Sequence, residues 1–317
     1  MNKTVSIVVP VFNEELSITT LVERISSVML ATDLSYELIL VNDGSTDTTG
    51  AIINEMISTN PNLFTIAFSR NFGHQSALKA GIDYAQGDCV ITMDADLQHP
   101  PDLLPSLIFQ WQDGFEVVHT KRLNDSESSF FKRNTSKYFY KTINRLSELQ
   151  LEDGSADFRL LDRKVVNVLK QLPERDPFFR GLVHWVGFKE TYVVYHPASR
   201  FAGKSHYTTK KMFRLALQGI TSFSTKPLYA AVYIGFFFAI ASLLYVPYAL
   251  VSYITGHIIQ GWASIIVTIA FFGGVQLLIM GIIGIYLGKL FMQSKQRPVY
   301  IIQHTNIEVE HGHLAKF

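Results

Sequence analysis

The sequence predicts an α/β domain with a mostly parallel sheet, followed by a C-terminal hairpin of two transmembrane helices. Strand-like and helix-like segments alternate from Val5 to Thr120, which is the pattern of a parallel sheet with helices on both faces. Farther along, the 62 residues from Pro227 to Gly288 contain no Asp, Glu, Lys or Arg. Charged residues make up 17% of the 317-residue chain, below the roughly 25% that is usual in soluble domains. Part of the chain is therefore expected to lie in lipid.

The alternating segments follow one another in a regular order. Short apolar, β-branched runs predict strands, and apolar residues at helical spacing predict helices. We expect strands at Val5–Val9, Glu37–Val41, Phe64–Phe68, Cys89–Met93 and Glu116–Thr120, separated by helices at Asn13–Leu30, Thr46–Ser58, His74–Ala85 and Pro101–Trp111. Ligands of such sheets bind beyond the carboxyl ends of the strands, so the residues directly after each strand are functional candidates. No GxGxxG follows the first strand and no Walker A sequence occurs, which argues against the usual dinucleotide and P-loop sites.

Two runs in the uncharged stretch, Leu228–Ile254 and Ala263–Gly288, are long enough to cross a bilayer, which takes about 20 residues per helix. Two core helices of a soluble protein are the alternative, but so long an uncharged stretch disfavours it. Basic residues flank the pair on both outer sides: Lys210, Lys211, Arg214 and Lys226 before it, and Lys289, Lys295 and Arg297 after it. The positive-inside rule therefore puts both termini in the cytoplasm, and Met1–Val9 lacks the features of a signal peptide.

This pattern divides the chain into four parts. We expect a cytoplasmic domain at residues 1–206, an amphipathic juxtamembrane helix at 207–226, two transmembrane helices at 227–290 and a cytoplasmic tail at 291–317. The tail holds a possible strand at Val299–Gln303, which could pair with another subunit.

Charge and cysteine content argue against three classes of protein. The formal net charge of +1 argues against a nucleic-acid binder, which would carry a clear basic excess. The single cysteine, Cys89, excludes an internal disulfide and a cysteine-based zinc site.

An Asp-x-Asp motif stands where the fourth strand ends. Residues two apart in an extended segment point to the same side, so Asp94 and Asp96 would face one point, with the amide oxygen of Gln98 near them. Two carboxylates and an amide oxygen suit Mg²⁺ or Mn²⁺, which binds substrate phosphates in its remaining positions. Two solvated aspartates in a turn are the alternative.

Six segments match a known family's motifs and occur in the same order: Ile7–Glu14, Val41–Asp47, Ser69–Gln75, Met93–Pro101, Gly154–Arg159 and Arg200–Ser205. They resemble the family 2 glycosyltransferases of GT-A fold, and within them the polyprenyl-phosphate glycosyltransferases, the group of dolichol-phosphate mannose synthase and the bacterial bactoprenol glucosyltransferases. The resemblance runs from the first strand through the hairpin to Arg297–Tyr300. One departure is His206, which stands where the family often has Lys after Gly-x-Ser, while Lys204 lies between Gly203 and Ser205.

The resemblance implies a nucleotide-sugar donor. The residues that it places around the donor's base and ribose are Pro10, Phe12, Glu14 and Asp43, with Ala95 beside the metal ligands. Asp43 would accept from the imide N–H of a pyrimidine, although Glu14 and Asp43 also stand where helix caps and turns are common. Arg200 and Lys204 would clamp the diphosphate or, alternatively, contact lipid headgroups. Arg70 and His74 also follow a strand end, in either a binding or a structural role.

The resemblance also implies a lipid phosphate as acceptor. Fixed cations must offset the repulsion between this phosphate and the donor's diphosphate, and Arg suits phosphate by its two-pronged geometry. The candidates are Arg122, Arg133, Ser136 and Lys137, of which the last three could equally form a solvated helix face. Asp157 matches the family's carboxylate near the reacting groups. It would act either as a base or by orienting Arg122 or Arg159, since a phosphate monoester, with a second pKa of about 6, is largely dianionic at pH 7 and already a nucleophile.

Together these features predict a metal-dependent, inverting transfer of a hexose, glucose from UDP-glucose, onto undecaprenyl phosphate at the cytoplasmic leaflet of a bacterial inner membrane. A mannosyltransferase using GDP-mannose and a non-catalytic, membrane-tethered nucleotide-sugar binding protein are the alternatives. A hydrolase would release free sugar without lipid. A processive synthase would need more spans and a Gln-x-x-Arg-Trp element, of which this chain has only Arg180 and Trp185. We also expect a homo-oligomer, for example a tetramer.

Overall fold

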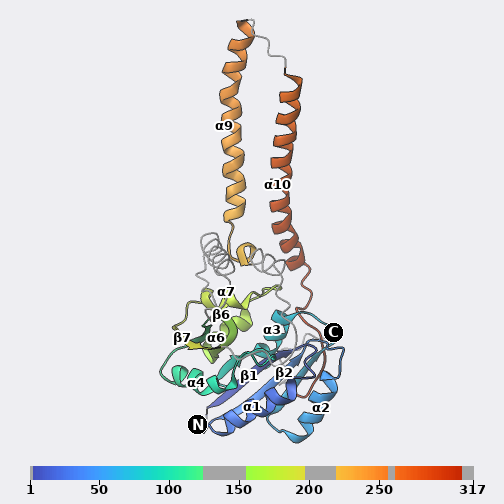
Figure 1. Ribbon diagram of the computed structural model, residues 1–317, viewed down its shortest axis with the longest axis vertical. Helices are drawn as coiled ribbons and strands as arrows, with labels where there is room; N and C mark the ends of the chain where they lie inside the picture. Colours follow the sequence, from blue (N-terminus) through green and yellow to red (C-terminus); the bar gives the residue numbers. More distant parts are fainter. Residues whose placement is uncertain (1–2, 124–154, 197–218, 256–260, 309–317) are drawn as a thin grey trace.

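The computed structural model describes residues 3–123, 155–196, 219–255 and 261–308. A sheet domain covered by helices occupies one end of an elongated molecule, and two long helices project from it (Figure 1). The sheet has eight strands in the order β7-β5-β6-β4-β1-β2-β3-β8. The architecture is the mostly parallel α/β sheet with a C-terminal helical pair that the sequence predicts.

The centre of the sheet is parallel. It consists of β1 (Thr4–Val11), β2 (Ser35–Asn42), β3 (Leu63–Phe68) and β4 (Cys89–Thr92), with β1 between β2 and β4. All but the first residue of β1 are buried, because helices cover both faces of a parallel sheet and its strands are apolar throughout. The four predicted strands are confirmed, with ends that differ by a few residues.

Four strands complete the sheet at its two sides. Beyond β4 lie β6 (Ser155–Asp162), β5 (Val117–Arg122) and β7 (Glu190–Tyr195), and β8 (Ile302–Thr305) lies beside β3. β6 runs antiparallel to both β4 and β5, so its first residues lie at the edge where β4 ends. The strand expected at Val299–Gln303 begins at Ile302 and pairs antiparallel with β3 of its own chain.

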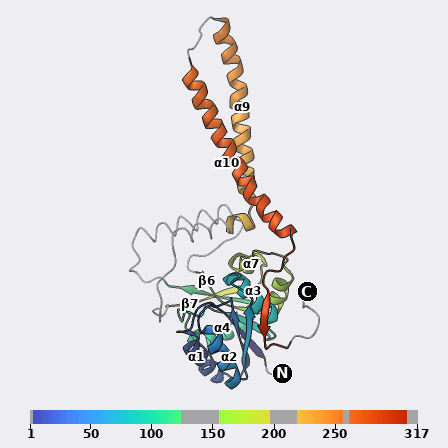
Figure 2. The same cartoon turned by 90° about the vertical axis from the view of Figure 1, so that its right-hand side faces the viewer.

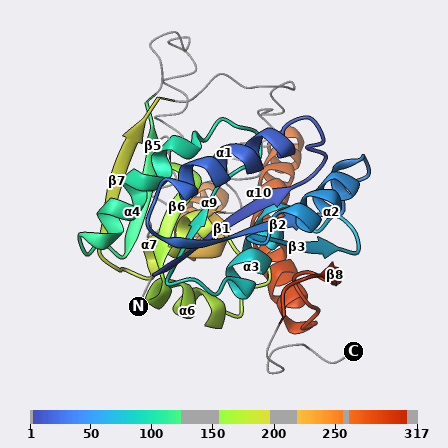
Figure 3. The ribbon, with the colours of Figure 1, turned by 90° about the horizontal axis from the view of Figure 1, so that it is seen from below.

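Helices cover the two faces of the sheet in two groups, which Figure 3 shows from below. The helices α1 (Ile18–Leu30), α2 (Thr49–Thr59) and α4 (Leu104–Gln112), which follows the short 3₁₀ helix η1 (Pro101–Leu103), pack on one face. The helices α3 (His74–Tyr84), α6 (Arg163–Gln171) and α7 (Phe179–Trp185) pack on the other.

The first helix starts later than the sequence predicts. We expected it at Asn13, but Asn13 has a φ of 56° and is outside the helical region. A turn follows, in which the carbonyl of Glu14 accepts from the backbone N–H groups of Ser17 and Ile18. The turn shortens α1, so the segment directly after β1 is not helical and lies at the edge of the sheet where β1 ends.

Helix α3 lies close to β1 because its residue 81 is glycine. A Cβ on Gly81 would overlap Cγ1 of Val8, a fully buried side chain of β1. We expect Gly81→Ala to destabilise the domain by about 1–3 kcal/mol, since overpacking outweighs the gain in helix propensity. Thermal unfolding measures the effect. The control is Gly50→Ala in α2, where the nearest atom is the flexible amide of Asn42 at 3.3 Å; equal shifts for both variants would contradict the packing argument.

The two long helices are α9 (Lys226–Ile254) and α10 (Trp262–Ser294). Both contain stretches long and apolar enough to cross a membrane, Lys226–Leu244 and Ile265–Ser294, of which 6% and 0% are buried. A core helix of a soluble protein would be mostly buried, so this exposure supports the prediction of membrane spans. Figures 1 and 2 show the pair directed away from the sheet.

Contacts near the hairpin attach it to the domain. The Tyr286 hydroxyl of α10 donates to the carbonyl of Ser224 at 2.6 Å, and Lys289 Nζ donates to Ser222 Oγ at 3.0 Å. Residues 219–223 are helical; the rest of the predicted amphipathic helix, up to residue 218, lies outside the described residues.

After α10 the chain returns to the sheet. The ring of Tyr300 stacks on Phe68 of β3 with centroids 5.2 Å apart, and its hydroxyl donates to Asp83 Oδ2 of α3 at 2.9 Å. Asn306 Oδ1 accepts from the backbone N–H of Thr65 at 2.7 Å. Residues 295–308, which we call the C-terminal strap, thus connect the end of α10 to β3 and α3.

Candidate active site

Functional candidates from four strands meet at one edge of the sheet. This is the edge where the parallel strands β1 to β4 end, and the antiparallel strand β6 begins beside them. The loop after β4 contributes Asp94 and Asp96, β6 contributes Asp157, and the first residue of α3 is His74. The topology therefore gathers these side chains although they are up to 83 residues apart in the sequence (Asp157 and His74).

The loop after β4 carries the predicted metal ligands. Asp94, Asp96 and Gln98 are partly exposed, whereas Ala95, Leu97 and His99 between them are buried. The extended segment that the sequence predicts is not present, because β4 ends at Thr92 and Leu97 has a φ of 60°. The loop is also held by its own contacts. Asp96 Oδ1 accepts from the N–H of Gln98 at 3.1 Å, and His99 Nδ1 accepts from the N–H of Asp94 at 3.1 Å.

His99 is one of the residues that sequence reasoning missed. It is 6% exposed and stacks on Phe158 of β6, with centroids 5.1 Å apart. Because its Nδ1 accepts a hydrogen bond, its proton is on Nε2. His99 therefore anchors the metal-ligand loop to the neighbouring strand.

His74 lies between two carboxylates of the site. Its Nε2 is 3.6 Å from Asp94 Oδ1 and 3.7 Å from Asp157 Oδ2. Burial alone would lower the pKa of His74, but the interaction with Asp157 and the charge of Asp94 outweigh it and raise the pKa above its ordinary value. Its place after a strand end was the available signal, but the sequence did not separate a binding from a structural role.

Asp157 is the most strongly bound carboxylate of the site. Arg159 Nη2 donates to its Oδ1 at 2.9 Å, and Arg180 donates from Nη2 to its Oδ2 at 2.9 Å and from Nε to both oxygens at 3.2 Å. Burial by itself would raise the pKa of Asp157, but the charge of Arg180, the interaction with His74 and the charge of Arg159 hold it well below its ordinary value. Of the two arginines that we considered for orientation by Asp157, the structure pairs it with Arg159.

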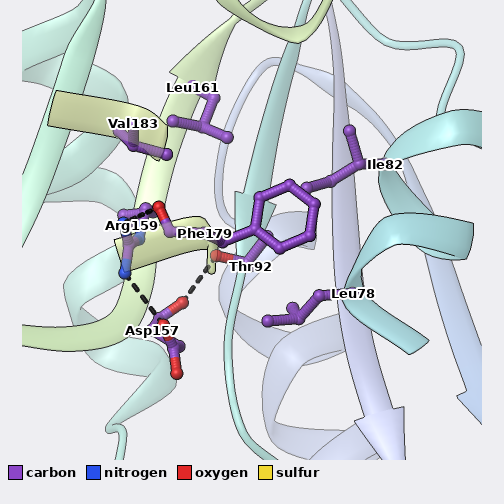
Figure 4. A pocket seen from close by; sticks show the side chains of 8 residues that line it. All are labelled: Leu78, Ile82, Thr92, Asp157, Arg159, Leu161, Phe179 and Val183. Carbon is purple, nitrogen blue, oxygen red and sulfur yellow. Dashed lines mark hydrogen bonds and ion pairs between the residues drawn. The ribbon is translucent and has the colours of Figure 1, made fainter. Parts of the chain in front are cut away.

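A small cavity lies behind this ion cluster. Figure 4 shows Asp157 and Arg159 on one side of the cavity and Leu78 and Ile82 on the other, with the ring of Phe179 between them. Its residues are Leu78, Ile82, Thr92, Asp157, Arg159, Leu161, Phe179 and Val183. Its volume of ≈ 10 Å³ is about that of one water-sized probe, so it does not admit a sugar.

The residues predicted around the nucleotide follow β1 and β2. Pro10 is buried in β1 and Phe12 is 44% exposed directly after it. Glu14 Oε2 accepts from the hydroxyl of Ser17 at 2.6 Å, which is a helix-start contact. Asp43 is buried and its Oδ1 and Oδ2 accept from the loop N–H groups of Phe72 and Gly73 at 2.7 and 2.9 Å. The predicted contact of Asp43 with the base stays a prediction; its loop contacts position the start of α3.

Arg122 is exposed at the end of β5. Its Nη1 lies 3.5 Å from Oε1 of Gln98, so it stands beside the metal-ligand loop. The other cationic and acceptor candidates, Arg133, Ser136, Lys137, Arg200 and Lys204, lie outside the described residues.

A second group of possible metal ligands lies away from this edge. The ligand atoms of His119, His184 and Glu190 are within 4.8 Å of one another, with His119 Nε2 and His184 Nδ1 at 3.1 and 2.9 Å from Glu190 Oε2. Burial, then the charge of Arg159, lowers the pKa of His119 to about 2, so its ring is neutral.

The geometry of this group favours hydrogen bonds over a metal. The imidazoles of His119 and His184 stack with an interplanar angle of 16° and centroids 4.5 Å apart, so their in-plane lone pairs do not converge on one ion. Histidine ligands also donate their second N–H to a partner, and His119 Nδ1 is buried with no hydrogen-bond partner in the described part of the chain. A buried lone pair at His119 Nδ1 costs less free energy than a buried N–H without an acceptor at the same place. The tautomer with its proton on Nε2, facing Glu190, is therefore favoured.

The chain is similar in sequence to a known protein family and to proteins of several bacteria and phages. Residues 6–169 match the family described as glycosyl transferase family 2. The chain is 45% identical to an uncharacterised glycosyltransferase of Bacillus subtilis, over 95% of this chain and 93% of that protein. It is 42% identical to the bactoprenol glucosyl transferase of Shigella phage SfV, over 95% and 98% of the two chains.

Among solved structures, the chain is similar to the mannosyltransferase of Pyrobaculum calidifontis in complex with GDP-Man and Mn²⁺. The TM-score is 0.48 and the identity 14%, over 70% of this chain and 64% of that one. It is also similar to glucosyl-3-phosphoglycerate synthase of Mycobacterium tuberculosis, with a TM-score of 0.46 and 20% identity, over 69% and 78% of the two chains.

Proposed function

The chain belongs to glycosyl transferase family 2, and from that premise we propose that it transfers glucose from UDP-glucose to undecaprenyl phosphate. The enzyme class, a glycosyltransferase, follows from the family. The donor, the acceptor and the dependence on a divalent metal are the proposed parts.

One observation carries the proposal. The chain is 40–42% identical over almost its whole length to proteins named bactoprenol glucosyl transferase or its homologue, from Shigella phages and Escherichia coli. The similarity extends beyond the family match at residues 6–169 and includes the apolar helices α9 and α10. A hairpin of this kind suits an enzyme whose acceptor stays in the bilayer.

The loop after β4 fits a divalent cation. Asp94, Asp96 and Gln98 offer oxygen atoms, are partly exposed, and stand at the carboxyl edge of the sheet, which agrees with the ligand preference of Mg²⁺ and Mn²⁺. Such an ion would stabilise the negative charge of the departing nucleoside diphosphate. Pro10, Phe12, Glu14 and Asp43 would bind the base and ribose, and Arg200 and Lys204 would hold the diphosphate.

Arg122, with Arg133, Ser136 and Lys137, would hold the acceptor phosphate against the repulsion of the diphosphate. In a single displacement the phosphate oxygen attacks the anomeric carbon, which inverts its configuration and releases the diphosphate. A carboxylate held far below its ordinary pKa by two arginines is a weak base, so we assign Asp157 the role of orienting its cationic neighbours.

The arrangement also supports a proposal for topology. β8 follows α10 in the chain and pairs with β3, which precedes α9, so both ends of the hairpin stand on one side of a membrane that α9 and α10 cross. With the basic residues at these ends, we propose that this side is the cytoplasm of a bacterium, with the domain at 1–206 and the tail at 291–317 both there.

The experiment that tests this function uses the full-length protein in detergent. It is incubated with undecaprenyl phosphate, Mg²⁺ or Mn²⁺, and radiolabelled UDP-glucose or GDP-mannose, and the lipid is extracted. We expect lipid-bound label from UDP-glucose, lost with EDTA. Label from GDP-mannose alone would favour the mannosyltransferase, free sugar in the absence of lipid would indicate a hydrolase, and nucleotide binding without turnover would indicate a binding protein.

Arg122→Ala is expected to weaken use of the lipid phosphate by about 10- to 100-fold in KM, the cost of one charge-assisted contact. Nucleotide binding should change far less, because Arg122 is not one of the residues proposed to bind the nucleotide or the metal. The assay varies the two substrates separately. Arg24→Ala, which removes an exposed partner of Asp102, is the control; equal losses for both substrates in Arg122→Ala would contradict the division of the site.

A further inference from the structure

The loop Ser69–Gly73, which joins β3 to α3, lies directly against the residues that follow β2. A Cβ on Gly44 would come within 2.5–2.9 Å of backbone atoms of Arg70 and Asn71, so the two segments meet backbone to backbone. Asp43 stands immediately before this contact. The position of the loop therefore sets the surroundings of Asp43, which is proposed to contact the base of the donor.

Two backbone N–H groups of the loop hold the carboxylate of Asp43. The N–H of Phe72 donates to Oδ1 at 2.7 Å, and the N–H of Gly73 donates to Oδ2 at 2.9 Å. Burial raises the pKa of Asp43, and these two hydrogen bonds oppose the rise. A shift of the loop would leave a buried carboxylate with fewer donors, which is unfavourable. The loop and the carboxylate thus form one unit.

The C-terminal strap contacts this unit where the loop begins. The N–H of Ser69 donates to the carbonyl of Ile301 at 3.0 Å. The ring of Tyr300 is parallel to that of Phe68, with an interplanar angle of 8° and centroids 5.2 Å apart. Phe68 in turn meets Phe72 edge to face, with centroids 5.7 Å apart. A row of three rings therefore connects the strap to the loop residue whose N–H holds the carboxylate.

Tyr300 is also fixed at its hydroxyl end. The hydroxyl donates to Asp83 Oδ2 at 2.9 Å, and Asp83 forms an ion pair with Lys79, one turn earlier in α3. Burial and the charge of Asp83 raise the pKa of Tyr300, so the hydroxyl keeps the proton that it donates. Tyr300 therefore contacts both elements that the loop joins: β3 through Phe68 and α3 through Asp83.

We propose that Tyr300 is a positioning residue for the donor, because its ring holds the loop Ser69–Gly73 in the place where the loop binds Asp43. The inference rests on the proposed function, in which Asp43 binds the base, and deepens it by naming a residue outside the site that sets the affinity for the nucleotide. The strap follows α10 in the chain and reaches the edge of the sheet at β3 (Figure 3). The same contacts therefore connect the membrane hairpin to the donor site.

The test compares Tyr300→Leu, which removes the ring, with Tyr300→Phe, which keeps the ring and removes the hydroxyl. The control is Asn306→Ala. Asn306 also belongs to the strap, but it bonds to the backbone of Thr65 and Leu63, toward the opposite end of β3 from the loop. It should lower the melting temperature without affecting the loop.

Nucleotide affinity is measured without turnover, by calorimetric titration of the full-length protein in detergent with UDP and Mn²⁺. We expect Tyr300→Leu to bind UDP about 5- to 10-fold more weakly, the scale of one aromatic pair. Tyr300→Phe should stay within about twofold of the wild type, since the ring makes the contact with β3. Asn306→Ala should bind UDP as the wild type does.

Two further measurements separate positioning from general stability. In the transfer assay, Tyr300→Leu should raise the KM for UDP-glucose by the same factor, while kcat and the KM for undecaprenyl phosphate stay within about twofold. In the protein without ligand, amide hydrogen exchange of the segment Ser69–Gln75 should be faster in Tyr300→Leu than in the wild type, and unchanged in Asn306→Ala.

A double variant tests the row of rings. Phe72→Leu keeps the backbone N–H that binds Asp43 but interrupts the row, so it should also weaken UDP binding. Combined with Tyr300→Leu, it should reduce the affinity by less than the product of the two single effects, because both act on the same contact. Independent, multiplying effects would contradict a shared route.

Three results would overturn the inference. The first is an unchanged UDP affinity and unchanged exchange in Tyr300→Leu. The second is an equal loss of affinity in Tyr300→Leu and Asn306→Ala, which would mean that any loosening of the strap has the same effect. The third applies if Tyr300→Leu does not fold: Phe72→Leu then decides, and wild-type UDP affinity in it refutes the row.

Failure of the inference is distinguishable from failure of the proposed function. A wild type that binds UDP and loses affinity on Tyr300→Leu, but transfers no sugar to lipid, would refute the proposed transfer and support the inference. Transfer of glucose to lipid with the same KM for UDP-glucose in the wild type and in Tyr300→Leu would support the function and refute the inference.

Discussion

Asp96→Ala is expected to abolish sugar transfer, by about a thousandfold or more, while the domain stays folded. Removal of one electrostatic stabiliser of a developing charge typically costs a hundred- to a thousandfold, and loss of a divalent ion costs more because it also holds the donor. Asp96 is partly exposed in the loop after β4, so its removal leaves no cavity in the core. Activity over a Mn²⁺ titration, with calorimetric binding of UDP in the presence and absence of Mn²⁺, measures the effect.

The control for this variant is Asp102→Ala, which removes an aspartate that is 69% exposed and pairs with Arg24. It should leave transfer and metal-dependent binding unchanged. Wild-type activity in Asp96→Ala, or lost activity with intact Mn²⁺-dependent binding of UDP, would rule out Asp96 as a metal ligand.

Asp157→Asn is expected both to inactivate the enzyme and to destabilise it. Arg159 and Arg180 would lose their shared counter-ion, and breaking a buried ion pair by removal of one partner costs about 3–5 kcal/mol. Transfer should fall at least about a hundredfold, since the cations that Asp157 orients would move. Thermal unfolding in detergent and the transfer assay measure the two effects.

A double variant separates pairing from packing. Asp157→Asn with Arg180→Gln should recover part of the lost stability, because one of the two cations that had paired with Asp157 is gone. If the double variant is less stable than Asp157→Asn by the full effect of Arg180→Gln, the two residues do not interact energetically.

The depressed pKa of Asp157 has a defined consequence for pH. A carboxylate whose pKa is lower in the folded than in the unfolded chain adds stability above its unfolded pKa of about 3.9, and this stability is lost as pH falls toward the folded value. Asp157→Asn should therefore unfold with a smaller acid dependence below about pH 4. The pH–rate profile of the wild type should likewise show no limb near neutrality from Asp157.

Much of the fold follows from the sequence because its signals are local. The strands β1 to β4 are apolar runs that end at turn residues, and the hairpin follows from length and lack of charge. The predicted start of α1 at Asn13 was wrong, because Asn13 has a positive φ. Its side chain contacts the loop after β2, where Asn13 Oδ1 accepts from the N–H of Thr46. The antiparallel insertion of β6 between β4 and β5 is a long-range pairing that no local pattern indicates.

The candidate site was predictable to a similar extent. The sequence predicts Asp94 and Asp96 on one side of an extended segment, and both are partly exposed between buried neighbours, but β4 ends at Thr92 and Leu97 has a φ of 60°, so the segment is a bend and not a strand. The contacts of Arg180 could not be anticipated, because they depend on the packing of α7 against β6, 23 residues back along the chain (Asp157 to Arg180). His74 had a positional signal only, and its location between Asp94 and Asp157 required the sheet order.

The C-terminal strap has a consequence for biogenesis. The ribosome makes β8 only after α9 and α10, yet β8 completes the edge of a sheet whose other strands precede both helices. Until α9 and α10 have entered the membrane and β8 has left the ribosome, the outer side of β3 has no strand to pair with. Any soluble fragment ended before α9 is expected to inherit that open edge, and should self-associate unless residues 295–308 are supplied as a separate peptide.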